Sequence, residues 1–382
     1  MRGFDRSEFI ARVAKAQSMM GANGIDALLL TTEQNLRYFT GYLTRFWESP
    51  SRPWFLIVPQ SGDPVAVIPS IGAALMAKTW IADIRTWSAP DLVDDGVSLL
   101  AQTLSEVLGQ GARIGVPSGH ETHLRMPLTD YARLQGLLPQ MTFGPDANIV
   151  HQLRLVKSAA EVAKIETACA IAGRAFQRVP EIAAAGVPLE RVFRDFQRLC
   201  LEEGADWVPY LAGGTGLLGY DDVISPATDA PLQSGAVLML DTGLVWDGYF
   251  CDYDRNYAIG APSAGLKSNW SRLLDATEAG KEAAKVGNTA RDVFRAMDAI
   301  CTGGQGGGDA GRLGHGLGMN LTEWPSFING DETELVDGMV ITLEPGITMP
   351  DGSVLVHEDN FVITAHGARQ LSPAAPRELW VI

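Results

Sequence analysis

Four carboxylates are concentrated in one short segment that is otherwise rich in apolar residues. The segment LDTGLVWDGYFCDYDR, residues 240–255, contains Asp241, Asp247, Asp252 and Asp254. Asp247 followed by Gly248 predicts a tight hairpin turn, which pairs position 241 with 254, whereas a turn centred one residue earlier pairs it with 252. Either register places carboxylates face to face, and positions 252 and 254 share one face of their strand. Opposed like charges destabilise a strand pair, so the pattern indicates either a bound cation or a solvent-facing edge hairpin.

Three further candidate metal ligands lie in apolar segments later in the chain. His315 is flanked by glycines in RLGHGLG, Glu344 follows the apolar run of ITLEPGI, and Glu358 lies within VLVHEDNFVIT. A buried carboxylate needs a partner, and few Lys or Arg residues stand beside these positions. Carboxylates with one imidazole suit Mn, Fe(II) or Co(II), with Zn as an alternative. The four cysteines are far apart and form no CxxC pair, which argues against a thiolate zinc site or a disulfide framework.

The order of these groups resembles the dinuclear metal site of the pita-bread metallopeptidases, a family that includes methionine aminopeptidase, aminopeptidase P, prolidase and creatinase. A DxG segment is followed by a second aspartate eleven positions later, and GHGxG and EPG segments come after it. RYFTGY, within residues 1–150, resembles the creatinase-like N-terminal domain of aminopeptidase P and prolidase, and HQLRLVKSAAEVAKI resembles the linking helix. The resemblance covers nearly the whole chain.

This resemblance implies an α+β fold with two domains. Residues 1–150 would form an N-terminal creatinase-like α/β domain, and residues 151–382 would form a C-terminal pita-bread domain that binds metal and carries the catalytic groups. Family members generally form homodimers in which the N-terminal domain reaches over the partner's site, so a homodimer is expected here.

The resemblance also implies two divalent metal ions, which would be Mn, Fe, Co or Zn. Asp241 and Glu358 would bridge or chelate one ion, and Asp252 would bind the other. His315 and Glu344 would complete the ligand shell. Such ions activate water and polarise a substrate carbonyl. Glu344 is the expected proton shuttle, and His315 and Asp254 complete the expected catalytic set.

Several positions depart from the family pattern. Peptidases of this family keep two further histidines at the substrate, and here Thr322 stands in the place of one and Ile224, seventeen residues before Asp241, in the place of the other. Loss of such a donor typically costs about 10²- to 10³-fold in rate. Asp254 stands where a threonine is usual, as an extra ligand, a base or a hydrogen-bond acceptor.

A second departure lies beside the last glutamate. Val356 occupies the position of a common arginine, and His357 adjoins the expected ligand Glu358. Strand alternation points His357 away from the face of Glu358, which favours a structural role.

Aromatic and polar residues near these segments indicate where a substrate would bind. RFWESPSRPWF and the segments around the ligands supply rings that could surround a cationic head group, with core packing or a dimer contact as the alternative. The segment GGTGLLG satisfies GxGxxG, but no helix clearly follows it, so a loop lining the substrate is expected instead of a dinucleotide site. The expected substrate contacts are Tyr220, Thr322, Trp324 and Trp47.

Three functions fit these residues. The first is a dinuclear-metal hydrolase of C–N bonds that resembles an Xaa-Pro dipeptidase or aminopeptidase, or one retuned to a small non-peptide zwitterion, as in creatinase and ectoine hydrolase. The second is a metal-dependent lyase on a small onium solute, similar to a dimethylsulfoniopropionate lyase of this fold, with Asp254 or another carboxylate as base. The third is a binding protein whose metal serves structure alone, which retention of all five ligands disfavours.

The charge balance of the chain argues against two classes of binding partner. The 382 residues carry 30 Lys and Arg against 45 Asp and Glu, a formal net charge of -15. Nucleic acids and anionic membranes are bound by clustered basic residues, so both are unexpected partners. The first residues, MRGFDRSEFIARVAK, lack the apolar core of a signal peptide, and no stretch approaches the roughly 18 apolar residues of a membrane span. A cytoplasmic enzyme acting on a small molecule or a short peptide is expected.

The elements that must position these residues can be read from periodicity. In the N-terminal part, an amphipathic helix around Phe9, Val13 and Met20 precedes the apolar segments DALLL, WFLIVP and DPVAVIP, a rhythm typical of an α/β domain.

The C-terminal part combines amphipathic helices with strands that pair antiparallel. Ser158 and Glu161 form a capping box before a long amphipathic helix, and further helices are expected at 188–204, 268–286 and 289–301. The strand-like segments carry the candidate ligands and do not alternate strictly with helices, which predicts an α+β domain.

Overall fold

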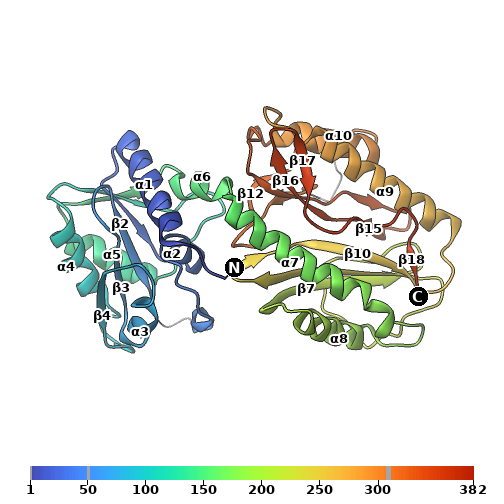
Figure 1. Cartoon of the computed structure of the whole chain (residues 1–382), viewed down its shortest axis with the longest axis horizontal. Helices are drawn as coiled ribbons and strands as arrows, with labels where there is room; N and C mark the ends of the chain where they lie inside the picture. The colour runs from blue at the N-terminus through green and yellow to red at the C-terminus, as the bar shows by residue number, and fades with distance from the viewer. Residues whose placement is uncertain (1, 50–51, 307–310) are drawn as a thin grey trace. The chain divides into compact units, whose positions relative to one another are not determined.

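The computed structural model describes residues 2–49, 52–306 and 311–382. The chain divides into two compact units, Met1–Arg154 and Leu155–Ile382 (Figure 1). Within the described ranges, no helix is both long and apolar enough to cross a lipid bilayer.

The N-terminal unit is built on one mixed sheet with the strand order β4-β3-β2-β1-β5-β6. β2 pairs antiparallel with β1 and β3, while the other neighbours are parallel. This arrangement agrees with the predicted α/β unit. Its helices and strands are α1 (Arg6–Asn23), β1 (Ala27–Leu30), α2 (Glu33–Thr40), β2 (Phe55–Pro59), β3 (Val65–Pro69), α3 (Ala73–Met76), β4 (Asp83–Trp87), α4 (Val97–Val107), β5 (Arg113–Val116), α5 (Leu128–Leu137), β6 (Thr142–Pro145) and α6 (Ile149–Leu155).

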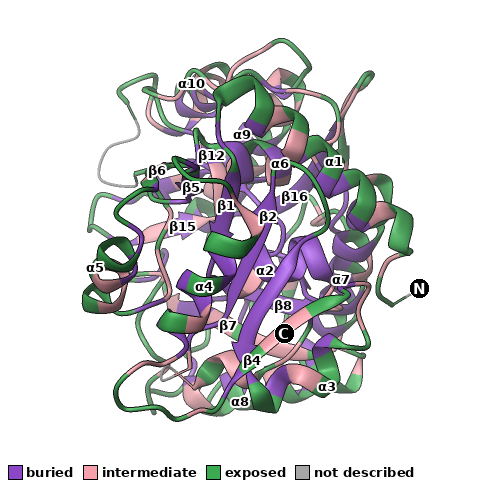
Figure 2. Cartoon of the chain, turned by 90° about the vertical axis from the view of Figure 1, so that its left-hand side faces the viewer, coloured by how far each residue is buried: buried purple, intermediate pink, exposed green. Residues whose placement is uncertain are grey.

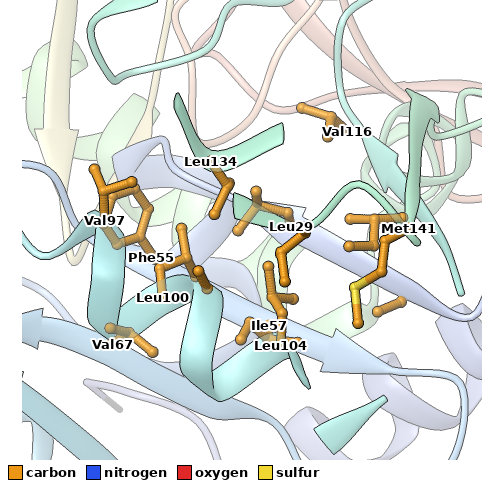
Figure 3. Close-up of a cluster of buried hydrophobic side chains, with 14 of the residues drawn as sticks. Leu29, Phe55, Ile57, Val67, Val97, Leu100, Leu104, Val116, Leu134 and Met141 are labelled. Atoms are coloured by element: carbon orange, nitrogen blue, oxygen red, sulfur yellow. The ribbon is translucent and has the colours of Figure 1, made fainter. Parts of the chain in front are cut away.

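The central strands of this unit are buried along their whole length because helices cover the sheet. Every residue of β1 and β2 is buried, as Figure 2 shows. Strands covered on both faces are continuous apolar runs, which explains why DALLL and WFLIVP lack polar alternation. In Figure 3, Leu29 and Ile57 of the sheet lie against Leu100 and Leu104 of α4.

The C-terminal unit contains two main sheets and a short ribbon. One sheet has the order β18-β10-β8-β7, with β9 paired to β8, and the other has the order β12-β11-β13-β16-β17, while β14 pairs with β15. The elements are α7 (Ala159–Gln177), α8 (Leu189–Glu202), β7 (Trp207–Gly216), β8 (Val237–Trp246), β9 (Tyr249–Phe250), β10 (Tyr253–Ala258), α9 (Ala264–Ala283), α10 (Ala290–Cys301), β11 (His315–Gly316), β12 (Glu323–Ser326), β13 (Val340–Leu343), β14 (Gly346–Thr348), β15 (Val354–Val356), β16 (Asp359–Thr364), β17 (Gly367–Gln370) and β18 (Trp380–Val381).

Each main sheet of this unit has its own helices. α7 contacts β8 and α8 contacts β7, whereas α9 contacts β13 and β17 (Figure 1). The pairings within both sheets are antiparallel apart from β10 with β18. The predicted α+β class and antiparallel sheet are therefore confirmed for this unit.

The α7 helix begins at the predicted capping box. The Ser158 side chain accepts a hydrogen bond from the Glu161 amide, and the Glu161 carboxylate accepts one from the Ser158 amide. These two bonds satisfy amide groups that have no partner inside the helix. The first long helix of the unit is thereby fixed at the residue where the sequence predicts it.

The acidic hairpin folds in the register of the tight turn. Asp247 and Gly248 have φ values of 48° and 80°, so both adopt the left-handed conformation of a two-residue hairpin turn. Asp241 consequently stands opposite Asp254. Of the two registers left open by the sequence, the structure adopts this one. The fourth carboxylate of the hairpin, on Asp247 in the turn, forms an ion pair with Lys164.

The two faces of strand β10 carry different types of residue. The Tyr253 and Tyr257 hydroxyls each donate a 2.7 Å hydrogen bond to an α7 carbonyl, those of Cys169 and Phe176. Side chains alternate along a strand, so Asp254 is directed to the opposite face, away from α7. The tyrosines therefore fasten the strand that carries the acidic residues to the long helix.

Strand β7 includes part of a segment that the sequence predicts as a loop. GGTGLLG is expected as a loop, but β7 runs through Gly216 and pairs antiparallel with β8. A Cβ atom on Gly213 would lie 2.2 Å from the Met239 carbonyl oxygen, so the glycine permits the two backbones to approach. Glycine-rich composition here marks a close strand pairing and does not interrupt the strand.

Replacement of Gly213 by alanine should destabilise the C-terminal unit by about 2–3 kcal/mol, because the added methyl group meets backbone that cannot rotate away. Differential scanning calorimetry would show a lower unfolding midpoint. Gly265→Ala is the matched control, since its Cβ would approach nothing closer than Ser263 Oγ at 3.9 Å. Equal midpoints for the two variants would contradict the close pairing of β7 with β8.

Candidate metal centre

The five expected ligands come from the strands of the two main sheets and from the residues next to them. Asp241 lies in β8, Asp252 directly precedes β10, His315 begins β11, Glu344 directly follows β13, and Glu358 directly precedes β16. The sheets meet where β10 contacts β16. Residues distant in sequence are thus brought together between the sheets.

Three of the five form a tight group. Asp252, His315 and Glu358 are all buried, and each offers a ligand atom within 4.8 Å of the other two. His315 Nε2 lies 3.4 Å from Asp252 Oδ2. Asp241 and Glu344 lie outside this tight group but interact with it electrostatically.

The His315 ring is oriented as a ligand. Its Nδ1 lies 2.8 Å from the Gly316 carbonyl oxygen. A carbonyl can only accept, so Nδ1 carries the proton and the lone pair is on Nε2, the nitrogen that faces Asp252. The His315 amide also donates to Thr342 Oγ1 at 3.2 Å, which fixes the backbone that carries the ring.

Asp241, Asp252, Glu344 and Glu358 form what we call the carboxylate cluster. Burial raises the pKa of each of the four carboxyl groups, and repulsion from neighbouring carboxylates, Asp254 among them, raises the pKa values further. Buried charges of one sign are unfavourable unless a countercharge lies between them.

Two oxygen atoms of this cluster await a partner. Asp241 Oδ1 and Glu358 Oε1 are buried and accept no hydrogen bond from residues 2–49, 52–306 or 311–382. The Tyr210 side chain interacts with the Asp241 carboxylate and opposes the rise in its pKa. Buried carboxylate oxygens together with an imidazole nitrogen are suitable ligands for Mn, Fe, Co or Zn. The residues present therefore fit a site for divalent metal.

Asp254 belongs to a separate buried network. Its Oδ1 accepts from the Glu358 amide at 3.0 Å and lies 3.3 Å from His357 Nδ1. The other ring nitrogen, Nε2, lies 3.0 Å from Asp359 Oδ2, and Arg255 Nη2 donates to Asp359 Oδ1 at 2.8 Å. Negative and positive groups alternate through this network, which lies behind Glu358.

The pKa values of His357 and Asp359 favour their charged forms, whereas burial raises the pKa of Asp254. Burial works against the imidazolium, but Asp359 and Asp254 outweigh it and raise the pKa of His357. Burial likewise opposes ionisation of Asp359, yet Arg255 and His357 lower the pKa of Asp359 to about 2. The structure thus places His357 in contact with two carboxylates, in keeping with the structural role that strand alternation favours.

Asn360 clamps the backbone of Asp252. Its Oδ1 accepts from the Asp252 amide at 3.0 Å, and its Nδ2 donates to the Asp252 carbonyl oxygen. Asn360 is fully buried, and its own amide donates to Ser372 Oγ. Such contacts orient a ligand without touching the metal.

Thr322 and its neighbours form the other side of the centre. Arg312 Nη2 donates to Thr322 Oγ1 at 3.2 Å, and Arg312 Nε lies 3.4 Å from Glu344 Oε1. Lys157 Nζ lies 3.1 Å from Glu323 Oε2 in a buried ion pair. Glu323 also accepts from the Asn320 amide at 3.1 Å, which fixes the turn before Thr322.

The other three expected substrate contacts, Tyr220, Trp324 and Trp47, each have different surroundings. Tyr220 is 1% exposed, and its hydroxyl accepts from the Val356 amide at 2.7 Å, an environment that suits packing. Trp324 is half-buried in β12. Trp47 is half-buried in the N-terminal unit, where its ring packs against Trp54 and the Arg125 guanidinium. Ile224, where the family has a histidine, is 82% exposed.

Sequence reasoning missed Arg312 and Asn360. Arg312 stands three residues before His315, so its proximity to the ligand was a usable signal. Asn360 follows Glu358 by two positions, but its contact with Asp252 joins β16 to β10 and has no local signature. Tyr210 has no local signal in the sequence, and its interaction with Asp241 arises from the pairing of β7 with β8.

Two family models match the chain. Residues 163–365 match metallopeptidase family M24, and residues 12–156 match the creatinase/prolidase N-terminal domain. All five expected ligands lie inside the first match. The two matches agree with the predicted pita-bread domain preceded by a creatinase-like domain.

Individual proteins are similar over their full lengths. The Xaa-Pro dipeptidase of Pyrococcus furiosus is 31% identical, over 94% of this chain and 97% of its own. The probable dipeptidase PepE of Mycobacterium tuberculosis H37Rv is 29% identical, over 100% of this chain and 98% of its own. The crystal structure of dipeptidase PepE from Mycobacterium ulcerans superposes with a TM-score of 0.84 at 29% identity, covering 99% of both chains.

Substitution of Asp241 by asparagine should move stability in opposite directions with and without metal. In metal-free protein the neutral amide removes repulsion with Asp252, Asp254 and Glu344, so unfolding should require about 1 kcal/mol more. Added Mn²⁺ should raise the midpoint of the wild type much more than that of the variant, because a ligand is lost. Thermal unfolding with and without a chelator measures both effects.

Asp275→Asn serves as the control, since the Asp275 side chain is 52% exposed and pairs with Arg377 at the surface. It should leave both midpoints within about 0.5 kcal/mol of the wild type. A metal-free Asp241→Asn protein less stable than the wild type would contradict the repulsion.

Proposed function

The chain belongs to metallopeptidase family M24, and from this membership we propose that it is an Xaa-Pro-type dipeptidase that hydrolyses a C–N bond at a centre of two divalent ions. One observation carries the proposal: Asp252, His315 and Glu358 meet in a buried group beside carboxylate oxygens that lack a partner among the described residues. We assign Asp241 and Glu344 to the same centre because their charges act on this group.

The chain's own residues supply acid–base chemistry and orientation. Divalent ions in such a centre would act as Lewis acids that polarise a carbonyl and make water more acidic. Glu344 is the proposed proton carrier, since its carboxyl pKa is raised and its side chain remains 24% exposed. It would take a proton from the attacking water and deliver it to the leaving nitrogen. His315 would hold its position through Nδ1 and Gly316.

We also propose that the enzyme hydrolyses peptides more slowly than is usual for the family. No histidine occupies position 322 or 224, and donors to a developing oxyanion are typically worth about 10²- to 10³-fold each. Thr322 and Arg312 supply hydrogen-bond groups at the first of these places, whereas Ile224 supplies none.

The lyase alternative is weakened by the surroundings of Asp254. A base must reach the substrate, but this side chain is fully buried and its Oδ1 contacts both the Glu358 amide and His357. We therefore propose that Asp254 positions Glu358 and does not act as base or ligand. Hydrolysis of a small zwitterion remains the second candidate, because the replacement of both histidines at the substrate is equally compatible with such a substrate.

The finer parts of the proposal rest on chemistry and on the family. Oxygen and nitrogen donors without thiolate favour Mn, Fe, Co or Zn. A homodimer and a cytoplasmic setting follow the family resemblance, and the four cysteines, all free and buried, suit a reducing compartment.

Metal-reconstituted protein should hydrolyse Xaa-Pro dipeptides, and chelation should abolish the activity. Metal content by mass spectrometry, followed by turnover assays after loading with Mn²⁺, Co²⁺, Fe²⁺ or Zn²⁺, tests this directly. Ectoine and dimethylsulfoniopropionate belong in the same panel. Glu344→Gln should lower kcat by at least about 10²-fold, because the amide cannot accept the proton.

The matched control is Glu332→Gln, which removes the charge of a glutamate whose side chain is 58% exposed. Its turnover should equal that of the wild type. Turnover of a solute in the panel with no cleavage of any dipeptide would refute the peptidase assignment.

Asp254→Asn should lower kcat less than about 10-fold and leave the metal content unchanged. The asparagine oxygen can still accept from the Glu358 amide, whereas loss of a general base would cost about 10²- to 10⁴-fold. Steady-state kinetics and metal analysis on the same preparation separate these cases. A loss of bound metal would instead identify Asp254 as a ligand.

A further inference from the structure

Two of the proposed metal ligands are each held from the opposite sheet. Asp252 directly precedes β10 and Glu358 directly precedes β16, and these strands belong to different main sheets that contact one another (Figure 1). Asn360, two residues after Glu358, bonds to the backbone of Asp252. Asp254, two residues after Asp252, bonds in the same way to the backbone of Glu358. Each sheet therefore supplies one ligand and also the side chain that holds the ligand of the other sheet.

These contacts engage both backbone groups of each ligand. Asn360 Oδ1 accepts from the Asp252 amide at 3.0 Å, and Asn360 Nδ2 donates to the Asp252 carbonyl oxygen. Asp254 Oδ1 accepts from the Glu358 amide at 3.0 Å, and Arg255 Nη1 donates to the Glu358 carbonyl oxygen at 3.2 Å. A residue whose amide and carbonyl are both held keeps its two backbone dihedral angles. The direction in which each carboxylate leaves the backbone is thereby fixed.

The two side chains that hold the ligands are themselves fixed. Asn360 is 0% exposed and Asp254 is 1% exposed, so neither can exchange its backbone partner for bulk water, and a broken bond would leave a buried polar group unpaired. Their strands are paired at the same positions, with Asp254 opposite Asp241 of β8 and Asn360 opposite Thr342 of β13. The contacts between the sheets are therefore anchored within both sheets.

Repulsion between the ligands is the force that these contacts oppose. Asp252 and Glu358 belong to the tight group with His315, in which the ligand atoms lie within 4.8 Å of one another. Buried carboxylates at that spacing repel one another when both are ionised. The hydrogen bonds of a ladder join strands of one sheet, so they do not resist a separation of the two sheets. The bonds that Asn360 and Asp254 make across the sheets do resist it.

We propose that Asp254 and Asn360 are reciprocal positioning residues, which together fix the spacing of Asp252 and Glu358 and so preorganise the centre for a divalent ion. The inference rests on the metal centre of the proposed function and deepens it. Neither side chain needs to touch the ion, because each acts through the backbone of a ligand. Since both act on one spacing, loss of either contact releases that spacing.

Titration calorimetry with Mn²⁺ on metal-free protein tests this coupling. Asn360→Leu keeps the approximate size of the side chain but removes both hydrogen bonds, and it should lower the affinity for Mn²⁺ about 10- to 100-fold, as is typical when a group that orients a ligand is lost. Asp254→Leu should lower it by a similar factor. Asp254→Asn should retain most of the wild-type affinity, because the amide oxygen can still accept from the Glu358 amide.

The double variant Asp254→Leu/Asn360→Leu measures the reciprocity. Its affinity should be little lower than that of the weaker single variant, because contacts that act on one spacing are not additive. Asn288→Leu is the control, since Asn288 Nδ2 also donates to a backbone carbonyl, that of Ala283 at the end of α9, at 2.7 Å. It should leave the affinity for Mn²⁺ unchanged. Should Asn360→Leu not fold, Asn360→Thr takes its place, with a smaller loss expected because a hydroxyl can keep one bond.

The outcomes distinguish this inference from the proposed function. Wild-type affinity for Mn²⁺ in the folded Asn360 variant, or a loss in the double variant equal to the product of the single losses, would overturn the reciprocal role. Equal losses in Asp254→Asn and Asp254→Leu would overturn it as well, because Asp254 would then be a ligand. A wild type that binds Mn²⁺ but cleaves no dipeptide would refute the peptidase assignment alone, whereas a wild type that binds none of Mn²⁺, Co²⁺, Fe²⁺ and Zn²⁺ would overturn both.

Discussion

The C-terminal unit depends on holding like charges together inside the protein. Burial and mutual repulsion raise the carboxyl pKa values of Asp241, Asp252, Glu344 and Glu358, and two of their oxygens lack a partner in the described residues. This arrangement is unfavourable for an isolated chain and favourable once divalent cations are present. Much of the surrounding structure keeps these groups from relaxing away from one another.

The scaffold holds these groups in place because the two faces of a strand make different contacts. On β10, tyrosine hydroxyls bind carbonyls of α7, while Asp254 on the opposite face bonds to the Glu358 amide. Asn360 ties the backbone of β16 to that of Asp252. The alternating charges of Asp254, His357, Asp359 and Arg255 then fill the space behind Glu358 without leaving an unpaired ion. Ligand geometry is set largely by residues that need not touch metal.

Local patterns predicted the parts of this structure that local physics controls. The capping box placed the start of α7, periodicity placed α8 and α10, and Asp247-Gly248 placed the hairpin. The register stayed open because it depends on turn geometry. The GGTGLLG segment was predicted as a loop because only the partner strand β8 reveals the close approach that its glycines permit. Arg312 stands three residues before His315, but its contact with Glu344, like that of Asn360 with Asp252, joins separate segments and is not signalled by any spacing in the sequence.

The buried ion pair of Lys157 with Glu323 links the beginning of the second unit to its reactive centre. The second unit begins at Leu155, and Lys157 forms an ion pair with the glutamate adjacent to Thr322. The ion pair joins the first residues of the second unit to the turn that supports Thr322, whose hydroxyl accepts a hydrogen bond from Arg312. A substitution of Lys157 would therefore remove the cation that is paired with the buried Glu323 carboxylate, next to the residue that stands where the family has a histidine.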